Sequence, residues 1–338
     1  MPRPTYFGAI EAGGTKFNCA FGLNHEAILE QKRIATVHPD DTLREVEAFF
    51  DYCVEKYGPM QSMGIACFGP VDLTKSSETY GYVINTPKPN WSFTPIVPRL
   101  EKRYGCPIGF DLDVNGSALG EMRFGAGRGL ENVAYVTIGT GIGVGVIANG
   151  KSLNGLLHPE FGHISLHKLE GEPDGVCKFH KNCAEGLACG PAIEKRWGAP
   201  AETFPIDHQM WKSQAYYTAA LCNAITLAYS PQRIILGGGV MTQPHLLAAI
   251  RKEFEVQLNG YVPAISRSGC VESYIVTPEL DNMSGIAGAF VSFFPCLTAR
   301  AIRSLQLASN KPHATVSATT SGSLRWTRIV SKSSSVIS

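Results

Sequence analysis

Acidic residues are missing from the last part of this 338-residue chain. No Asp or Glu follows Asp281, whereas six of the 30 lysines and arginines do. The net charge of the whole chain is +1, so the body before this part, with 24 basic and 29 acidic residues, is mildly acidic. An acidic body argues against nucleic acid as the main partner.

Long apolar runs are also missing. No stretch approaches the roughly 18 apolar residues that a membrane-spanning helix needs, so we expect no membrane partner. The first residues lack the apolar core of a secretory signal peptide. Ten cysteines in such a chain are better explained as reduced thiols and metal ligands than as disulfides. We therefore expect a cytoplasmic protein.

Familiar phosphate-binding motifs are absent, but two glycine-rich hairpins are present. G-x-x-x-x-G-K-[ST] does not occur, and Val144 stands where G-x-G-x-x-G needs its third glycine. The first hairpin has Gly13, Gly14, Thr15 and Lys16 at its turn; the second has Thr140 and Gly141. Backbone N–H groups in such turns can surround a phosphate, so the pair suggests a two-lobed phosphate site. Two tight hairpins without a ligand are the alternative.

Two carboxylates follow a predicted strand, Pro107 to Asp111. Asp111 and Asp113 lie where that strand ends and a helix begins, the edge at which open α/β sheets bind ligands. A carboxylate there can take the proton of a hydroxyl that attacks phosphorus. Either aspartate can instead be a helix cap.

Histidines and cysteines gather between residues 156 and 189. His163, Cys177, His180 and Cys183 supply two nitrogens and two sulfurs, as a structural tetrahedral Zn²⁺ site requires. Cys189, His158 and His167 could replace a member of this set. Glu160 and Glu185 flank it and could accept hydrogen bonds from sugar hydroxyls, or simply be solvated.

The remaining pattern predicts a duplicated α/β fold with a cleft between two lobes. Gly237, Gly238, Gly239, Val240 and Met241 follow a buried strand and form either a nucleotide-binding turn or a plain βα turn. Thr42 to Glu45 predicts a capping box, residues 271–276 a strand, and Asn149-Gly150 a hairpin turn. Residues 295–338, rich in Ser and Thr, are predicted to be disordered; a basic amphipathic anchor or a translated non-homologous extension is the alternative.

The chain resembles the ROK sugar kinases, most closely their bacterial-type fructokinase branch. The resemblance runs from about Tyr6 to Phe290. It depends on the following motifs, in this order: Glu11-Ala-Gly-Gly-Thr-Lys16, Phe68-Gly-Pro-Val-Asp72, Thr86-Pro-Lys-Pro-Asn-Trp91, Asp111-Leu-Asp-Val-Asn-Gly-Ser-Ala-Leu-Gly-Glu121, Ile138-Gly-Thr-Gly-Ile-Gly143, His158-Pro-Glu-Phe-Gly-His163, Cys177/His180/Cys183 and Leu236-Gly-Gly-Gly239.

The resemblance implies an actin/hexokinase-like (RNase H-like) fold, with two lobes around an ATP–sugar cleft. Residues 1–115, completed by a helix at 284–294, would form the small lobe, and residues 116–283 the large lobe. Asp113 would be the catalytic base. Both hairpins would hold the ATP phosphates with Mg²⁺, and Pro191 and residues 237–241 would lie near the nucleotide.

The resemblance also assigns the sugar side of the cleft. Gly69, Glu160, His163 and Glu185 would contact the sugar, and His163, Cys177, His180 and Cys183 would bind a structural zinc. Leu112 stands where glucokinases of the family commonly have Asn, and C-x-x-H-x-x-C replaces their three-cysteine set. Both departures favour fructose as the substrate.

Other functions stay open at this point. Mannose, glucose or an N-acetylhexosamine could be the substrate, and a sugar sensor without activity is a further alternative. A repressor of this fold would need an N-terminal helix-turn-helix, for which the first strand at Tyr6 leaves no room. Members of the family are often homodimers, which we expect here too.

Overall fold

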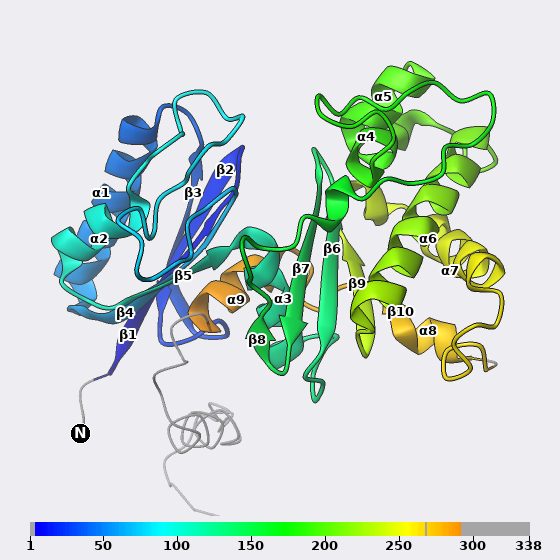
Figure 1. Cartoon of the computed structure of the whole chain (residues 1–338). Helices are drawn as coiled ribbons and strands as arrows, with labels where there is room; N and C mark the ends of the chain where they lie inside the picture. Colours follow the sequence, from blue (N-terminus) through cyan, green and yellow to red (C-terminus); the bar gives the residue numbers. More distant parts are fainter. Residues whose placement is uncertain (1–3, 268, 292–338) are drawn as a thin grey trace, which may run out of the picture. The chain divides into compact units, whose positions relative to one another are not determined.

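The computed structural model describes residues 4–267 and 269–291 (Figure 1). The segment predicted to be disordered, 295–338, lies outside the described residues. No helix in the described ranges is long and apolar enough to cross a lipid bilayer.

The first sheet has five strands in the order β3-β2-β1-β4-β5. Strand β2 is antiparallel to its two neighbours, β1 and β3, whereas β4 and β5 continue the sheet in parallel with β1. The strands are β1 (Tyr6–Ala12), β2 (Lys16–Gly22), β3 (Ile28–Ala35), β4 (Met60–Cys67) and β5 (Ile108–Leu112).

The second sheet repeats this arrangement with β8-β7-β6-β9-β10. Strand β7 is again antiparallel to its two neighbours, β6 and β8, and β9 and β10 run parallel to β6. The strands are β6 (Val133–Ile138), β7 (Ile142–Ala148), β8 (Lys151–Ser152), β9 (Arg233–Gly237) and β10 (Ile275–Val276). The identical order and direction of strands confirm the predicted duplicated α/β fold.

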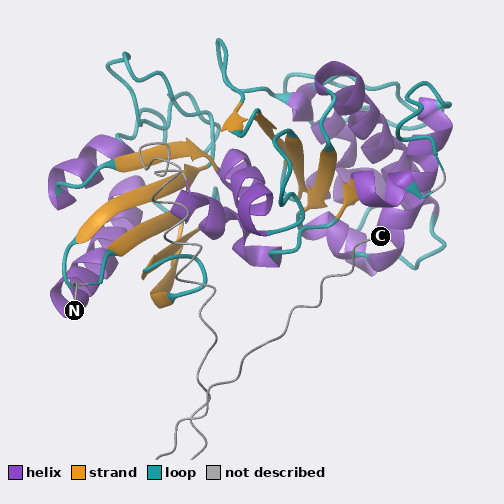
Figure 2. Cartoon of the chain, turned by 90° about the horizontal axis from the view of Figure 1, so that it is seen from below, coloured by secondary structure: helices purple, strands orange, loops and turns teal. Residues whose placement is uncertain are grey.

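The helices follow the strands in the same order along the chain in both halves, and Figure 2 shows helices packed beside the strands of both sheets. In the first half these are α1 (Pro39–Tyr57), α2 (Ile96–Tyr104) and α3 (Asp113–Phe124); the counterparts in the second are α6 (Gln209–Tyr229), α7 (Pro244–Leu258) and α9 (Ser284–Val291). The second half adds α4 (Ala184–Ala188), α5 (Gly190–Trp197) and α8 (Cys270–Tyr274). Apolar residues at helical spacing explain α1, which buries Leu43, Val46, Phe49 and Phe50.

The helices that end each half pack against each other and are exchanged between the sheets. Helix α3 contacts β6 and β7 of the second sheet, and α9 contacts β1 and β4 of the first. Their contact is close because it is made by glycines: a Cβ on Gly288 would overlap the carbonyl of Gly116, and one on Gly120 would overlap that of Ser284. Asp113 begins α3, so this crossing fixes its place.

Three local predictions have different outcomes. Asn149 and Gly150, both with positive φ, form the turn between β7 and β8 as predicted. The capping box is wrong: α1 begins at Pro39, and the Thr42 hydroxyl bonds to Val37 N–H and Ala35 C=O instead. Residues 271–276 are mostly α8, with β10 restricted to two residues.

Candidate active site

Asp113 is the first residue of α3 and follows β5 directly. It does not cap the helix: Leu112 is at the N-cap position, and the Asp113 carboxylate accepts a hydrogen bond from the adjacent Val114 N–H at 2.8 Å. Burial, with smaller contributions from the charges of Glu11 and Glu160, raises the pKa of Asp113 to about 7. A carboxylate with a pKa near neutrality is suited to accept a proton and release it again.

Asp111 has a different environment. Its carboxylate accepts hydrogen bonds from Asn115 Nδ2 at 2.7 Å, from Leu112 N–H at 2.8 Å and from the Ser152 hydroxyl. Asn115 in turn accepts the Val146 N–H of β7. Asp111 therefore connects β5 and α3 to the second sheet, and its oxygens are engaged. The structure thus separates two aspartates that their position at the end of a strand leaves equivalent.

Glu11 on β1 is a candidate that sequence reasoning assigned no role. It accepts a 2.7 Å hydrogen bond from Asn18, and burial raises its pKa while the nearby Lys16 opposes this shift. Lys16 forms no ion pair within 4 Å among the described residues. Glu11, Lys16 and Asp113 thus form one electrostatic group. The sequence shows that Glu11 precedes the Gly-Gly-Thr-Lys turn, but only the fold shows that its charge acts on Asp113.

The turn of the first hairpin is short and open. Gly13 N–H donates to Lys16 C=O at 2.9 Å, and Thr36 binds both Gly13 and Thr15. Gly14 and Thr15 are exposed at the tip, and a Cβ on Gly14 would meet no atom within 4 Å. The tip is therefore accessible to a ligand.

The second hairpin brings three predicted elements together. Gly190 N–H, just before Pro191, donates to Gly139 C=O at 2.7 Å. Gly238 has φ 93° and lies so close to Ile138 that a Cβ would overlap its backbone. These contacts bring one group of predicted nucleotide-binding residues together: Thr140, Gly141, Pro191 and the turn at 237–241. The first hairpin is held separately, by Thr36.

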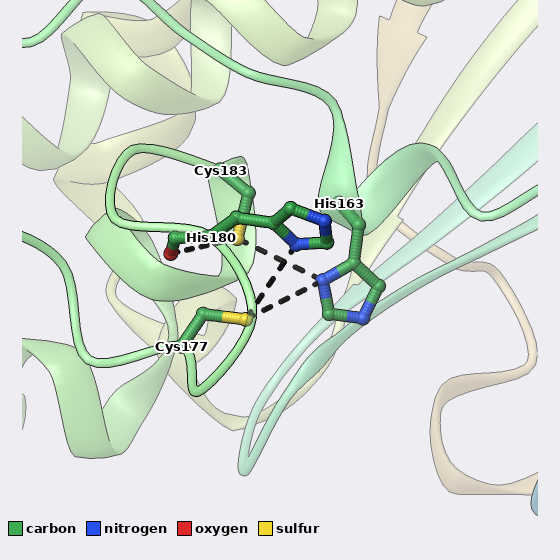
Figure 3. A group of neighbouring side chains, drawn as sticks. All are labelled: His163, Cys177, His180 and Cys183. Atoms are coloured by element: carbon green, nitrogen blue, oxygen red, sulfur yellow. Dashed lines mark hydrogen bonds between the residues drawn. The ribbon is translucent and has the colours of Figure 1, made fainter.

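His163, Cys177, His180 and Cys183 converge although 20 residues separate the first from the last (Figure 3). Their ligand atoms all lie within 4.8 Å of one another. The Sγ–Nδ1 distances are 3.8 Å for Cys177–His163, 3.8 Å for Cys177–His180 and 3.7 Å for Cys183–His163. Ligands at ordinary Zn–S and Zn–N lengths in a tetrahedron stand ~3.5 Å apart, so this donor set fits a metal ion.

His163 connects this cluster to Glu185. Its Nδ1 faces the cysteine sulfurs, and its Nε2 lies 3.9 Å from Glu185 Oε1. Glu185 Oε2 accepts the Ile142 N–H at 3.0 Å, and a Cβ on Gly141 would overlap this carboxylate. A bound metal would therefore orient Glu185 and the second hairpin through one imidazole.

The other predicted sugar residues lie near Asp113. A Cβ on Gly69 would be 2.9 Å from the Leu112 side chain. Glu160 is exposed, with 51% of its side chain accessible, yet its charge still acts on Asp113. Gly69 thus lies against the residue that precedes Asp113, and Glu160 acts on Asp113 through its charge.

Solved structures with this actin/hexokinase-like architecture include ROK sugar kinases. A ROK family glucokinase from Streptomyces griseus, in complex with glucose and AMPPNP, has a TM-score of 0.65 and 26% identity; the match covers 84% of this chain and 97% of that one.

The ROK family model matches residues 7–293, and the chain belongs to this family. A fructokinase from Streptococcus mutans is 41% identical over 288 residues, 83% of this chain and 95% of that protein. A fructokinase from Lactococcus lactis is 40% identical over 296 residues, which cover 87% of this chain and 98% of that protein.

Proposed function

We propose that this chain is an ATP-dependent fructokinase, which converts D-fructose to fructose 6-phosphate. The observation that carries the proposal is the near-complete match, at about 40% identity, to several fructokinases. The glucokinase with a solved structure is 26% identical. A kinase for one of the alternative substrates, mannose, glucose or an N-acetylhexosamine, would differ from a fructokinase only in the sugar that it binds.

Asp113 is the proposed general base. A half-buried carboxylate with a pKa of about 7 can take the proton of the 6-hydroxyl as its oxygen attacks the γ-phosphorus. The proton stays on Asp113 until the product leaves. Gly69, Glu160, His163 and Glu185 hold the sugar so that the 6-hydroxyl faces Asp113.

The two hairpins are proposed to hold the phosphates. N–H groups at Gly13, Gly14 and Thr15 donate to the phosphoryl oxygens from one side, and those at Thr140 and Gly141 from the other. Lys16 neutralises charge. Pro191 and residues 237–241 face the base and ribose, because the second hairpin lies against them.

Two metals complete the proposal. Mg²⁺, when bound with ATP, would neutralise phosphate charge, and the partly buried carboxylate of Glu11 fits a divalent cation. A structural Zn²⁺ fits the two sulfurs and two nitrogens of His163, Cys177, His180 and Cys183.

The proposed organisation follows the two sheets. Residues 1–115 with α9 form the small lobe and residues 116–283 the large lobe, the metal segment 156–189 belonging to the latter. We further propose a cytoplasmic homodimer, which size-exclusion chromatography with light scattering tests.

The decisive experiment is ADP release with Mg-ATP and a panel of fructose, mannose, glucose and N-acetylglucosamine. Fructose should give the highest kcat/KM. A preference for glucose would contradict the substrate but keep the kinase. A folded, metal-loaded protein that releases no ADP with any sugar would contradict the kinase itself and favour a sugar sensor.

A further inference from the structure

His158 is a buried histidine with an unused ring nitrogen. Only 6% of its side chain is accessible, and Nε2 is buried with no hydrogen-bond partner among the described residues. A buried polar atom without a partner is costly, so native proteins rarely keep one without a reason. A ligand that donates a hydrogen bond to Nε2 would remove this cost.

Nε2 faces the edge of the proposed sugar site. A Cβ on Gly69 would lie 3.7 Å from Nε2 and 2.9 Å from the side chain of Leu112, the residue that precedes Asp113. Residues 154–158 also line a cavity of about 570 Å³, opposite Asp72 and Thr74. The imidazole therefore lines a cavity, and its Nε2 lies against Gly69, one of the predicted sugar contacts.

The other ring nitrogen indicates what Nε2 can do. Nδ1 lies 3.3 Å from Glu160 Oε1. The carboxylate favours the proton on Nδ1, which leaves a lone pair on Nε2. A sugar hydroxyl is a donor that fits this lone pair and the limited space beside Gly69.

We propose that His158 Nε2 accepts a hydrogen bond from a hydroxyl of the bound hexose and thereby contributes to the choice of sugar. This inference rests on the proposed function. Leu112 has no polar atom to offer at this point, so His158 supplies the polar contact on that side. A site built to bind a hydroxyl discriminates strongly against a sugar that lacks it, because its own polar atom is then left unpaired.

Two variants test the contact. His158→Leu removes the acceptor at similar volume, and His158→Gln keeps an acceptor. His25→Leu is the matched control, because His25 also has a buried nitrogen without a partner, but it stacks on Phe124 at the far end of α3. Melting temperature and metal content show whether each variant is folded.

We expect the His158 variants to bind the sugar less well while their binding of ATP stays unchanged. His158→Leu should raise the KM for fructose by roughly tenfold, with a smaller change in kcat and no change in the KM for ATP. His158→Gln should recover part of the loss, and His25→Leu should behave as wild type. An unchanged KM for fructose in the folded His158→Leu variant overturns the proposal.

A cycle with altered sugars separates contact from packing. Wild type and His158→Leu are compared on fructose and on monodeoxy fructoses that lack the hydroxyl at carbon 1, 3 or 4. If His158 binds one hydroxyl, removing it should cost wild type about tenfold in kcat/KM and cost the variant almost nothing. Equal losses in both proteins for every analogue would overturn the contact and indicate that a water or packing fills the site.

Turnover by the wild type tests the proposed fructokinase activity separately from the proposed His158 contact. If wild type phosphorylates another hexose instead of fructose, the proposed substrate fails, and the same cycle with deoxy forms of that hexose decides the role of His158. If no sugar is phosphorylated, calorimetric binding of fructose to wild type and His158→Leu decides it.

Discussion

The two aspartates at the end of β5 should behave as opposites. Asp113→Asn keeps the shape of the side chain but cannot take a proton, so we expect kcat to fall by about 10²–10⁴-fold while ATP binds nearly as before. The measurement is steady-state turnover beside calorimetric binding of a non-hydrolysable ATP analogue. Retained turnover in the purified variant would contradict the assignment.

Asp111→Asn is the matched control for that variant. Asparagine has one acceptor oxygen, so it cannot accept all three donors that now bind the Asp111 carboxylate. We expect a loss of about 1–3 kcal/mol in stability, seen as a lower Tm, and turnover within tenfold of wild type. A larger loss of kcat in Asp111→Asn than in Asp113→Asn would reverse the two roles.

The raised pKa of Asp113 predicts how activity depends on pH. The base must be deprotonated, so kcat/KM should rise with pH and level off above about pH 7. Glu160→Gln removes a charge that raises this pKa, so the rising limb should move to lower pH even though the sugar binds less well. Profiles from pH 5.5 to 9 check both, and a limb that does not move contradicts the coupling.

The same pKa has a consequence for stability. Because it is higher in the folded protein than the value of ~3.9 in an unfolded chain, the neutral carboxyl favours folding fully below about pH 4. This contribution is lost as the pH rises through 7. Asp113→Asn should therefore exceed wild type in Tm by more at pH 8 than at pH 5. Above about pH 7, the ionised Asp113 therefore lowers the free energy of unfolding.

Among the elements, the metal segment should be the most sensitive to chelation. We expect about one zinc per chain by elemental analysis, its loss in Cys183→Ser, and its retention in Cys270→Ser, since Cys270 lies outside the cluster. Because His163 lies between the donor set and Glu185, zinc removal should raise the KM for sugar more than the KM for ATP. A metal-free preparation with full activity would contradict the assignment.

Elements with local signals were predictable from the sequence, and those decided by neighbours were not. Asn149-Gly150 suits positive φ, so the β7–β8 turn was found. Thr42 followed a capping pattern, but the end of β3 offered Ala35 C=O and Val37 N–H as competing partners. Cys270 to Tyr274 is helical, although β-branched and aromatic residues favoured a strand.

The candidate site shows the same division. From glycine spacing, a strand end and Cys/His spacing, the two hairpins, the Asp111/Asp113 pair and the Cys/His group could be predicted, and the family resemblance favoured Asp113. The separation of Asp111 from Asp113 could not, because it depends on Ser152, 41 residues from Asp111 along the chain. Glu11 and His158 were missed as site residues for the same reason: only the fold places them beside Asp113 and Gly69.

At the scale of the whole molecule, the exchange of α3 and α9 makes each half depend on the other. Ile286, Ala289 and Phe290 of α9 cover Phe7 and Ala9 of the first sheet. Helix α3 likewise packs Ala118 and Met122 on the second sheet. Neither half can unfold without exposing an apolar face of the other, so we expect one calorimetric unfolding transition for residues 4–291 rather than two.

Gly288→Ala tests this dependence at the crossing of the two helices. The added Cβ would overlap the Gly116 carbonyl, a backbone atom that cannot move without shifting α3. We expect a loss of about 1–3 kcal/mol that moves the single transition as a whole. Gly155→Ala is the control, since its Cβ would meet nothing closer than 3.9 Å. A variant in which one half melts early while the other keeps the wild-type Tm would show that the halves are independent. In that case α3 and α9 join two separate folding units, and the position of Asp113 would not depend on the second half.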